Sequence, residues 1–382
     1  MKFLCAPDAY KESLSAAEAA LAMATGIRRV HPDAQIMCLP LSDGGEGFGA
    51  VQAEHGGFTA ITQRDVTGPT IELHQRVCAT WYWQPATRTA LIESAETQGL
   101  ALVPSGSRNP ARTTSYGTGQ LISAALDRGA RRIVVGLGGT GTCDGGAGAA
   151  AALGVRYTAG SVTLPATITG AKLPEIEHID LAGLDPRLHE CELIAAFDVA
   201  APLLGPQGAA HLYAPQKGAD PQTVRRLENA LSHWASLLTA HTDLEFATLR
   251  GAGAAGGMGA GLAALLGAQL TSGAEWVLNA VNFDDHLAET DIVFTGEGRL
   301  DAQTGMGKVC AAVHQRAQRA DVPVVALVGQ QEPGLVLPPG LTVRTFGDGL
   351  PLSRALDEAP KHLAAATAAS LLAPSGSVSE TQ

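Results

Sequence analysis

Acidic residues stand directly after predicted β-strands, inside glycine-rich segments, at five places along the chain. Ligands of open α/β sheets bind at the carboxyl edge of the strands, so these positions are candidates for a site. Carboxylates among backbone amides suit a phosphate with Mg²⁺, because amides hold phosphoryl oxygens while acids hold the metal or accept a proton. The acids of the five segments are Asp8, Asp43 with Glu46, Asp144, Asp198, and Glu297 with Asp301.

Each of these acids also has a purely structural explanation, because an aspartate in a glycine-rich turn often caps a helix or forms an Asx-turn. That explanation stays open for Asp8 and Asp144. It is weaker for Asp43, since flanking glycines cost backbone entropy unless something approaches closely. Polar residues follow the fifth segment at Gln303, Thr304 and Lys308, and two further lysines lie beside Pro- or Gly-marked loops, Lys11 and Lys217.

Short β-rich runs alternate with Ala-rich helical runs along nearly the whole chain, which is typical of an α/β protein with a largely parallel sheet. The predicted strands are 2–6, 35–41, 132–136, 193–197, 291–295, 322–328 and 341–346. The predicted helices are about 15–30, 114–128, 145–153, 221–241, 257–266, 309–320 and 353–372. Ser13 or Ser15 can cap the first helix, and Ser15 with Glu18 predicts a capping box.

The segment 64–83 departs from this alternation, because its Val, Thr, Ile, Tyr and Trp residues alternate as in antiparallel strands. We therefore predict two α/β domains. One is discontinuous and built from both chain ends, 1–64 and 285–382, and the other is inserted at 65–284. Within the insertion, 158–184 is predicted to be a polar surface excursion, and the tail 374–382 is predicted to be disordered.

Composition excludes several classes of protein. The 382 residues carry a formal net charge of −11, which argues against binding along a nucleic-acid backbone. The six cysteines are scattered without a C-x-x-C pair, so a disulfide scaffold and a zinc site are not expected. The N-terminal apolar run is too short for a signal peptide, and the uncharged stretch 251–274 is mostly Gly and Ala. We expect a cytoplasmic protein that does not enter membranes.

Two G-x-G-x-x-G matches, at 136–141 and 251–256, are background in a chain with 45 glycines. They motivate an alternative, a nicotinamide-dependent hydroxyacid oxidoreductase, but the first match lacks the acid expected about 20 residues later. No G-x-x-x-x-G-K-[ST] and no kinase H-R-D set is present. Standard P-loop and protein-kinase machinery is therefore excluded, whereas phosphate binding by other glycine-rich loops is not.

Read together, the motifs resemble one family over nearly the whole chain, the bacterial type I glycerate kinases. The sequence A-P-D-A-Y-K-E-S-L-S-A at 6–16 is similar to that family's A-P-D-S-F-K-x-S-L-S-A. Seven further motifs match in order and spacing, at 41–47, 113–119, 138–148, 205–209, 215–219, 251–257 and 295–304.

The resemblance implies ATP-dependent phosphorylation of D-glycerate, usually on the 2-hydroxyl, to give 2-phosphoglycerate, with ATP and Mg²⁺ as cofactors. It also implies two α/β domains, one flavodoxin-like and one resembling restriction-enzyme folds, with the site in the cleft between them. No nucleic-acid or membrane partner is implied, and the oligomeric state, monomer or homodimer, stays open.

Four positions depart from the family pattern: Phe197 and Ala201 replace a cysteine and an asparagine, Cys143 replaces an asparagine, and Met306 replaces a histidine. The lost side-chain amides predict an altered substrate range or a weaker ligand contact. They also motivate a second alternative, a noncatalytic sensor of a sugar acid or nucleotide that kept the fold.

We assign roles within this set as hypotheses. The general base is Asp43 or Asp198, with Lys11 as a further catalytic residue. The expected substrate-binding residues are Asp8, Ser13, Arg299 and Gln303. The expected ATP-binding residues are Gly138, Gly139, Thr140, Asp144, Gly253, Gly256, Lys217 and Lys308. The expected magnesium ligands are Glu297 and Asp301.

Overall fold

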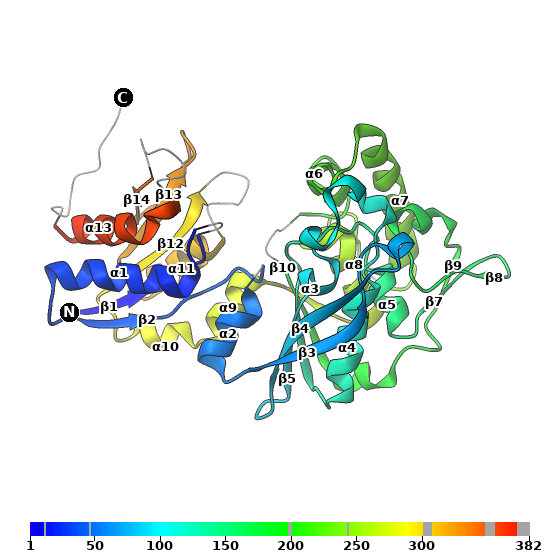
Figure 1. Ribbon diagram of the computed structural model, residues 1–382, viewed down its shortest axis with the longest axis horizontal. Helices are drawn as coiled ribbons and strands as arrows, with labels where there is room; N and C mark the ends of the chain where they lie inside the picture. Colours follow the sequence, from blue (N-terminus) through cyan, green and yellow to red (C-terminus); the bar gives the residue numbers. More distant parts are fainter. Residues whose placement is uncertain are drawn as a thin grey trace. The chain divides into compact units, whose positions relative to one another are not determined.

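The computed structural model describes residues 1–10, 13–45, 47–197, 201–242, 244–300, 308–347 and 356–372. These form two compact units (Figure 1), one of Met1–Asp43 with Val277–Gln382 and the other of Gly44–Trp276. The chain changes unit at 43/44 and 276/277, whereas the sequence analysis expects 64/65 and 284/285. The first change comes earlier because β3 (Thr59–Thr67) pairs with β4 (Arg76–Gln84) and joins the second unit's sheet.

The terminal unit contains a five-stranded sheet with the order β2-β1-β12-β13-β14. All four pairings are parallel, so the sheet has the doubly wound order 2-1-3-4-5, in which ligands bind where the strand order reverses. Its strands are β1 (Lys2–Cys5), β2 (Gln35–Cys38), β12 (Ile292–Leu300), β13 (Val324–Gln331) and β14 (Leu341–Thr345). Its helices are α1 (Ala16–Val30), α10 (Phe283–Leu287), α11 (Lys308–Arg319) and α13 (Ala359–Leu372).

Helix α1 begins as the sequence predicts. The Ser15 side chain accepts from the Glu18 amide, and the Glu18 side chain accepts from the Ser15 amide, so the capping box is confirmed. The helix packs closely on α13 (Figure 1), because a Cβ atom at Gly26 would lie only 2.3 Å from the Ala364 carbonyl oxygen. Chain segments from the two ends thereby share one apolar core.

The inserted unit contains a six-stranded mixed sheet with the order β11-β10-β6-β5-β4-β3. The predicted antiparallel strands in 64–83 are present, since β3, β4 and β5 pair antiparallel, whereas β5, β6, β10 and β11 pair parallel. The remaining strands are β5 (Thr89–Glu93), β6 (Arg132–Gly136), β10 (Glu192–Phe197) and β11 (Gln269–Ser272). The excursion at 158–184 holds a small antiparallel sheet of β7 (Arg156–Ala159), β8 (Val162–Thr163) and β9 (His178–Asp180).

Small residues dominate the helices of the inserted unit and allow close packing around its core. The helices are α2 (Phe48–Gly56), α3 (Ala95–Gln98), α4 (Tyr116–Asp127), α5 (Ala147–Ala152), α6 (Ala209–Tyr213), α7 (Pro221–Thr239) and α8 (Ala254–Leu266). Helix α9 (Gly273–Ala280) contains the point where the chain returns to the terminal unit.

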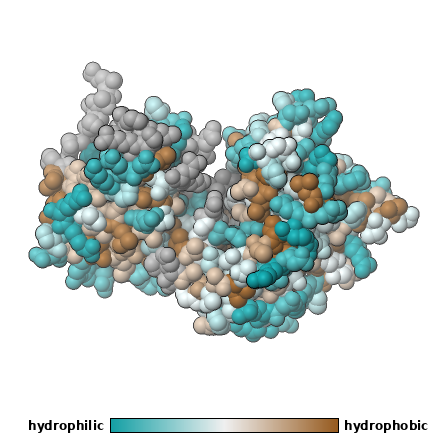
Figure 2. All heavy atoms as spheres, viewed as in Figure 1, coloured by the Kyte–Doolittle hydropathy of each residue, from teal (hydrophilic) through white to brown (hydrophobic). Residues whose placement is uncertain are grey.

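Two predictions about elements change in the structure. Strand β12 continues to Leu300, where the sequence predicts a loop from residue 296, because its backbone stays paired with β13 up to Gln331. Helix α13 begins at Ala359 rather than 353, and the predicted disordered tail 374–382 lies outside the described residues. Polar and apolar side chains are interspersed on the face shown in Figure 2. Among the described residues, no helix is long and apolar enough to cross a membrane.

Candidate active site

Three predicted acids lie on adjacent strand segments of the terminal unit: Asp8 and Asp43 follow β1 and β2, and Glu297 lies within β12. The Leu41 amide donates to the Pro7 carbonyl at 2.9 Å, and the Asp8 amide donates to the Gly296 carbonyl at 2.9 Å. These bonds hold the segments before Asp43, around Asp8 and before Glu297 at one edge of the sheet. The strand order reverses between β1 and β12, so this edge is the position at which doubly wound sheets bind ligands.

The same edge carries a negative electrostatic field. Tyr10 is buried, and its hydroxyl donates to the Leu327 carbonyl at 2.6 Å. Burial raises the pKa of Tyr10 and of the Cys310 thiol well above their usual values, and the nearby Glu297 and Asp8 carboxylates raise both further. Charges that disfavour an anion here favour a cation, so the edge suits a metal ion or a basic side chain.

The other residues predicted in this unit are placed as follows. Glu297 is half-buried and Arg299 exposed on strand β12, two positions apart and therefore on one face of the sheet. The Ser13 hydroxyl donates to the Leu356 carbonyl at 3.1 Å, so it fixes the C-terminal segment. Residues outside the described part of the chain are Lys11, Glu46, Asp198, Asp301, Gln303 and Met306, and nothing is described of the Lys308 side chain.

In the inserted unit, the segment 138–146 forms a loop at the carboxyl end of β6. A Cβ atom at Gly138 would lie 2.7 Å from the Gly45 Cα, so two glycine-rich segments touch through their backbones. The Lys217 ammonium, only 5% exposed, donates to the Thr142 carbonyl at 2.8 Å and the Thr140 hydroxyl at 3.2 Å. The predicted residues of this loop and Lys217 are therefore brought together.

Asp144 lies inside this loop rather than on its surface. Its carboxylate is fully buried and accepts from the amides of Ser115, Gly146 and Gly148 and from the Ser115 hydroxyl. Burial raises the pKa of Asp144, while these donors act in the opposite direction. The structure thus gives Asp144 a role in holding the loop against the start of α4.

The N-terminal end of α8 packs against the same loop. Three consecutive residues have left-handed backbone, Ala255 (φ 53°), Gly256 (φ 68°) and Gly257 (φ 89°). The Gly145 amide donates to the Gly256 carbonyl at 3.1 Å, and a Cβ atom at Gly256 would lie 2.1 Å from the Thr142 carbonyl oxygen. Predicted residues Gly253 and Gly256 therefore belong to the same cluster of backbone groups as 138–146.

Gly44, the first residue of the inserted unit, lies against the end of β10. A Cβ atom at Gly44, directly after Asp43, would lie 3.7 Å from the Ala196 side chain and carbonyl oxygen. Ala196 is two positions before Asp198 in the sequence. The described neighbours of Asp43 and Asp198 therefore meet at one edge of the inserted unit's sheet.

Three supporting residues were missed by the sequence analysis. Glu93, at the end of β5, accepts from the Gly47 amide at 3.1 Å and the Gly49 amide at 2.8 Å. The carbonyl of Gln98 accepts from the Gly141 amide, and its side chain accepts from the Thr142 hydroxyl. Ser115 holds Asp144. Only Glu93 had a usable signal, an acid directly after an apolar strand.

The structure shows the surroundings of two residues that depart from the family pattern, Cys143 and Ala201. The Cys143 thiol is buried in the apolar core, which raises its pKa to about 12, so this substitution changes packing behind the loop. The Ala201 carbonyl accepts from the Gly253 amide at 3.1 Å, and its side chain is buried.

Comparison with known proteins identifies the family of this chain. A sequence model of the glycerate kinase family matches residues 3–371. The glycerate 2-kinase of Escherichia coli K12 is 44% identical over 334 residues, covering 86% of this chain and 85% of that protein. The glycerate kinase of Bacillus subtilis 168 is 44% identical over 333 residues, covering 86% and 85%.

A solved structure extends the agreement to three dimensions. The crystal structure described as a glycerate kinase 2 from Salmonella typhimurium LT2 superposes with a TM-score of 0.82 at 40% identity, covering 97% of each chain. Sequence and fold thus agree over nearly the whole length, and this chain belongs to the glycerate kinase family of phosphotransferases.

Proposed function

We propose that this enzyme transfers the γ-phosphoryl group of ATP to the 2-hydroxyl of D-glycerate, giving 2-phosphoglycerate and ADP. The observation that carries the proposal is the row of Asp43, Asp8 and Glu297 across β2, β1 and β12 at the point where the strand order reverses. Phosphoryl transfer needs groups that position two substrates and stabilise charge on the moving phosphoryl, rather than covalent catalysis.

The ATP phosphates are assigned to the glycine-rich cluster of the inserted unit. Residues Gly138, Gly139 and Thr140, together with Gly256, offer backbone amides that a phosphate can approach without obstruction by side chains. The Gly253 amide donates to the Ala201 carbonyl, so we assign Gly253 to shaping this cluster. Lys217 adds a positive charge held directly beneath them by Thr140 and Thr142. Asp144 keeps the loop in shape, and Lys308 is assigned to the phosphates from the sequence alone.

The proton acceptor is Asp43 or Asp198. In the transfer step the glycerate O–H bond breaks, its oxygen bonds to the γ-phosphorus, and the bond from that phosphorus to the β-γ bridging oxygen breaks. The proton moves to the carboxylate, and ADP carries away the bridging oxygen. Lys11, Arg299, Ser13, Asp8 and Gln303 are the residues we assign to the substrate.

Magnesium is part of the proposal. Mg²⁺ is usually bound through one or two carboxylates together with substrate phosphates and water. The negative field around Glu297 and Asp8 fits a cation of this kind, and we assign the ion to Glu297 and Asp301. When bound, it would neutralise charge on the β- and γ-phosphates. Because the reaction consumes ATP, we also place the enzyme in the cytoplasm.

Phosphorus NMR of purified protein with Mg-ATP and D-glycerate tests the proposal. A 2-phosphoglycerate resonance that grows as ADP forms is expected. A 3-phosphoglycerate resonance would overturn the assigned position, and folded protein without any product would overturn kinase activity on glycerate.

The base assignment is tested separately with Asp43→Asn and Asp198→Asn. Asn keeps the size of each side chain but cannot accept a proton, so the base variant is expected to lose about 100-fold or more in kcat. Asp33→Asn, at an exposed aspartate of the terminal unit, is the matched control. Full activity in both variants would exclude both candidates.

A further inference from the structure

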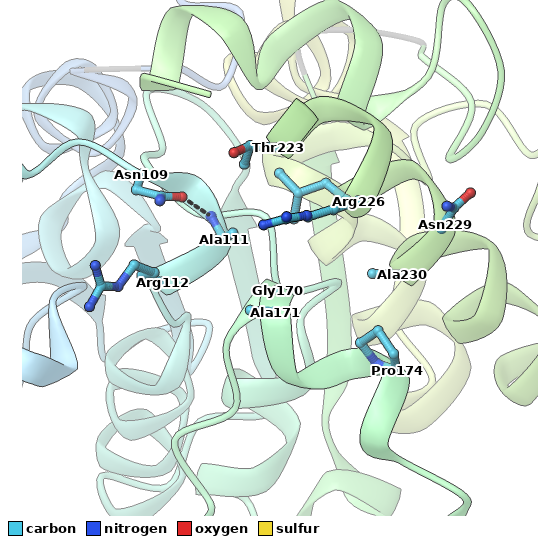
Figure 3. Close-up of a pocket in the computed structure, with 11 residues that line it drawn as sticks. Asn109, Ala111, Arg112, Gly170, Ala171, Pro174, Thr223, Arg226, Asn229 and Ala230 are labelled. Atoms are coloured by element: carbon cyan, nitrogen blue, oxygen red, sulfur yellow. Dashed lines mark hydrogen bonds between the residues drawn. The ribbon is translucent and has the colours of Figure 1, made fainter. Parts of the chain in front are cut away.

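A cavity of about 610 Å³ lies in the inserted unit between three segments that the proposed function does not use. Its walls are the 3₁₀ helices η4 (Pro110–Arg112) and η5 (Gly170–Glu175) and the first three turns of α7 (Figure 3). This volume lies within the range of small-molecule sites. The polar residues that line it are Asn109, Arg112, Thr223, Arg226 and Asn229.

The lining carries one positive charge that the described residues leave unpaired, although the chain as a whole has a net charge of −11. It includes two arginines and, among the described residues, no acid. The Arg112 guanidinium is paired with Glu72 through two nitrogens, whereas Arg226 has no hydrogen bond and no ion pair within the described part of the chain. Figure 3 shows the Arg226 side chain extending from α7 towards Asn109 and Ala111.

The side-chain amide of Asn109 can complete the coordination of an anion. The Asn109 side-chain oxygen accepts from the Ala111 amide at 3.0 Å, so the NH₂ group of Asn109 is the part of its side chain that can donate to a ligand. Asn229 also lines the cavity, but Figure 3 shows its amide pointing away from Arg226 and Asn109. Guanidinium and amide donors together suit carboxylate or phosphate oxygens.

The cavity shares its walls with the glycine-rich loop. Gly170 lies against this loop, because a Cβ atom there would be 2.5 Å from the Cys143 carbonyl oxygen. Thr113, directly after Arg112, donates from its hydroxyl to the Gly141 carbonyl at 3.0 Å. A ligand that moves η4 or η5 therefore moves segments that contact the loop at Gly141 and Cys143.

We propose that this cavity is a regulatory site for a small organic polyanion, bound chiefly by Arg226 and sensed by the loop 138–146. The proposal that an anion binds in this cavity does not depend on the proposed function. The proposal that the anion regulates the enzyme rests on the proposed function of that loop in holding ATP. The ligand class is a compact acid with two or three carboxylate or phosphate groups.

The binding test uses tricarballylate, a small tricarboxylate that has no hydroxyl group to be phosphorylated. Isothermal titration is made without Mg²⁺ on wild type, Arg226→Gln and the matched control Arg225→Gln, which changes the neighbouring exposed arginine outside the lining. We expect Arg226→Gln to weaken binding about tenfold or more, since one charge-assisted contact is lost. No saturable binding, or equal weakening in both variants, would overturn the site.

The regulatory test measures the KM for ATP with and without saturating tricarballylate at constant free Mg²⁺. A change of about threefold or more in wild type that is absent in Arg226→Gln is expected. An unchanged KM in a protein that binds the anion would overturn regulation. A protein that binds the anion but phosphorylates no glycerate would contradict the proposed function and leave the binding site supported.

Discussion

The Ser115 hydroxyl donates to the buried Asp144 carboxylate at 2.7 Å and accepts from the Ala149 amide at 2.9 Å. One serine at the start of α4 therefore links the glycine-rich loop to the first turn of α5. Ser115→Ala removes both bonds in a site without water access, which predicts a loss of about 2 kcal/mol in the free energy of unfolding. Urea denaturation measures this, and the exposed Ser107→Ala control is expected within about 0.5 kcal/mol of wild type. Equal midpoints for both variants would contradict this role.

Substitution of two glycines at opposite ends of α8 distinguishes the energetic cost of backbone strain from that of steric obstruction. Gly256 and Gly267 have nearly the same φ, 68° and 70°, but a Cβ atom meets the Thr142 carbonyl oxygen at 2.1 Å only at Gly256 and nothing within 4 Å at Gly267. Gly267→Ala is expected to cost about 1 kcal/mol from left-handed strain alone. Gly256→Ala is expected to cost about 3 kcal/mol or more, since backbone must move. Thermal unfolding of the pair measures the difference, and equal costs would contradict the close approach.

Local signals in the sequence predicted much of the fold. The alternation of strands and helices, the capping box of Ser15 and Glu18 and the antiparallel strands after residue 64 depend on neighbouring residues, so they could be predicted. The predicted end of strand β12 at residue 295 was wrong. Gly296 and Gly298 indicate a loop in the sequence, whereas their backbones pair with a distant strand. The first domain boundary moved for another reason, because β3 pairs with β4 and so belongs to the inserted unit.

The candidate site was predictable only in its chain positions. The acids predicted after strands lie near the carboxyl ends of strands, but burial of Asp144 depends on α4, α5 and α8 packing around it, which no local pattern reports. The contributions of Ser115 and Gln98 likewise arise from partners 29 and 44 positions away. Their residue types are too common to stand out in a sequence.

Substitution of Lys217 is predicted to reduce activity in a protein that still folds. Lys217→Met keeps an unbranched apolar chain but removes the charge beneath Thr140 and Thr142, so kcat/KM for ATP is expected to fall about 100-fold. The control is Lys172→Met, which removes an exposed lysine paired with Glu175 in the same unit. Steady-state kinetics with circular dichroism of both variants checks this. Full activity in a folded Lys217→Met protein would remove Lys217 from the ATP site.

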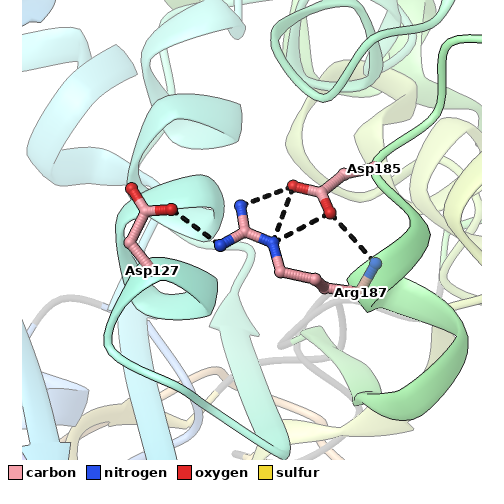
Figure 4. A network of polar contacts seen from close by, with 3 residues as sticks. All are labelled: Asp127, Asp185 and Arg187. Carbon is pink, nitrogen blue, oxygen red and sulfur yellow. Dashed lines mark hydrogen bonds and ion pairs between the residues drawn. The ribbon is translucent and has the colours of Figure 1, made fainter.

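Arg187 joins two carboxylates on the surface of the inserted unit, Asp127 of α4 and Asp185 (Figure 4). The hydrogen bonds from Arg187 lower the pKa of Asp185, so this pair stabilises the fold above the ordinary aspartate pKa and loses its effect as pH falls through the lowered value. Arg187 is 44% exposed, so solvent screening limits the contribution. Arg187→Gln is expected to cost about 1 kcal/mol at pH 7.

The stability difference between wild type and Arg187→Gln should shrink as pH falls from 7 through the lowered pKa of Asp185, and it should disappear where Asp185 is protonated. It should also shrink in 0.5 M NaCl. Urea denaturation across this pH range measures both effects, with Arg225→Gln as the surface control. A difference that persists at low pH would show that Arg187 stabilises the fold through packing instead.

Cys5 and Cys38 are register partners on adjacent parallel strands of the terminal unit. The Cys5 thiol donates to the Cys38 sulfur, and with the Arg28 charge this lowers the pKa of Cys38 to about 7. Alkylation of Cys38 by iodoacetamide is therefore expected to reach half its maximal rate near pH 7. Mass spectrometry of timed reactions gives the rate at this one residue. Cys5→Ala should raise the pH midpoint of Cys38 alkylation towards an ordinary thiol value, whereas Cys5→Ser, which retains a donor, should raise it less. Identical midpoints in both variants would exclude the hydrogen bond as the cause.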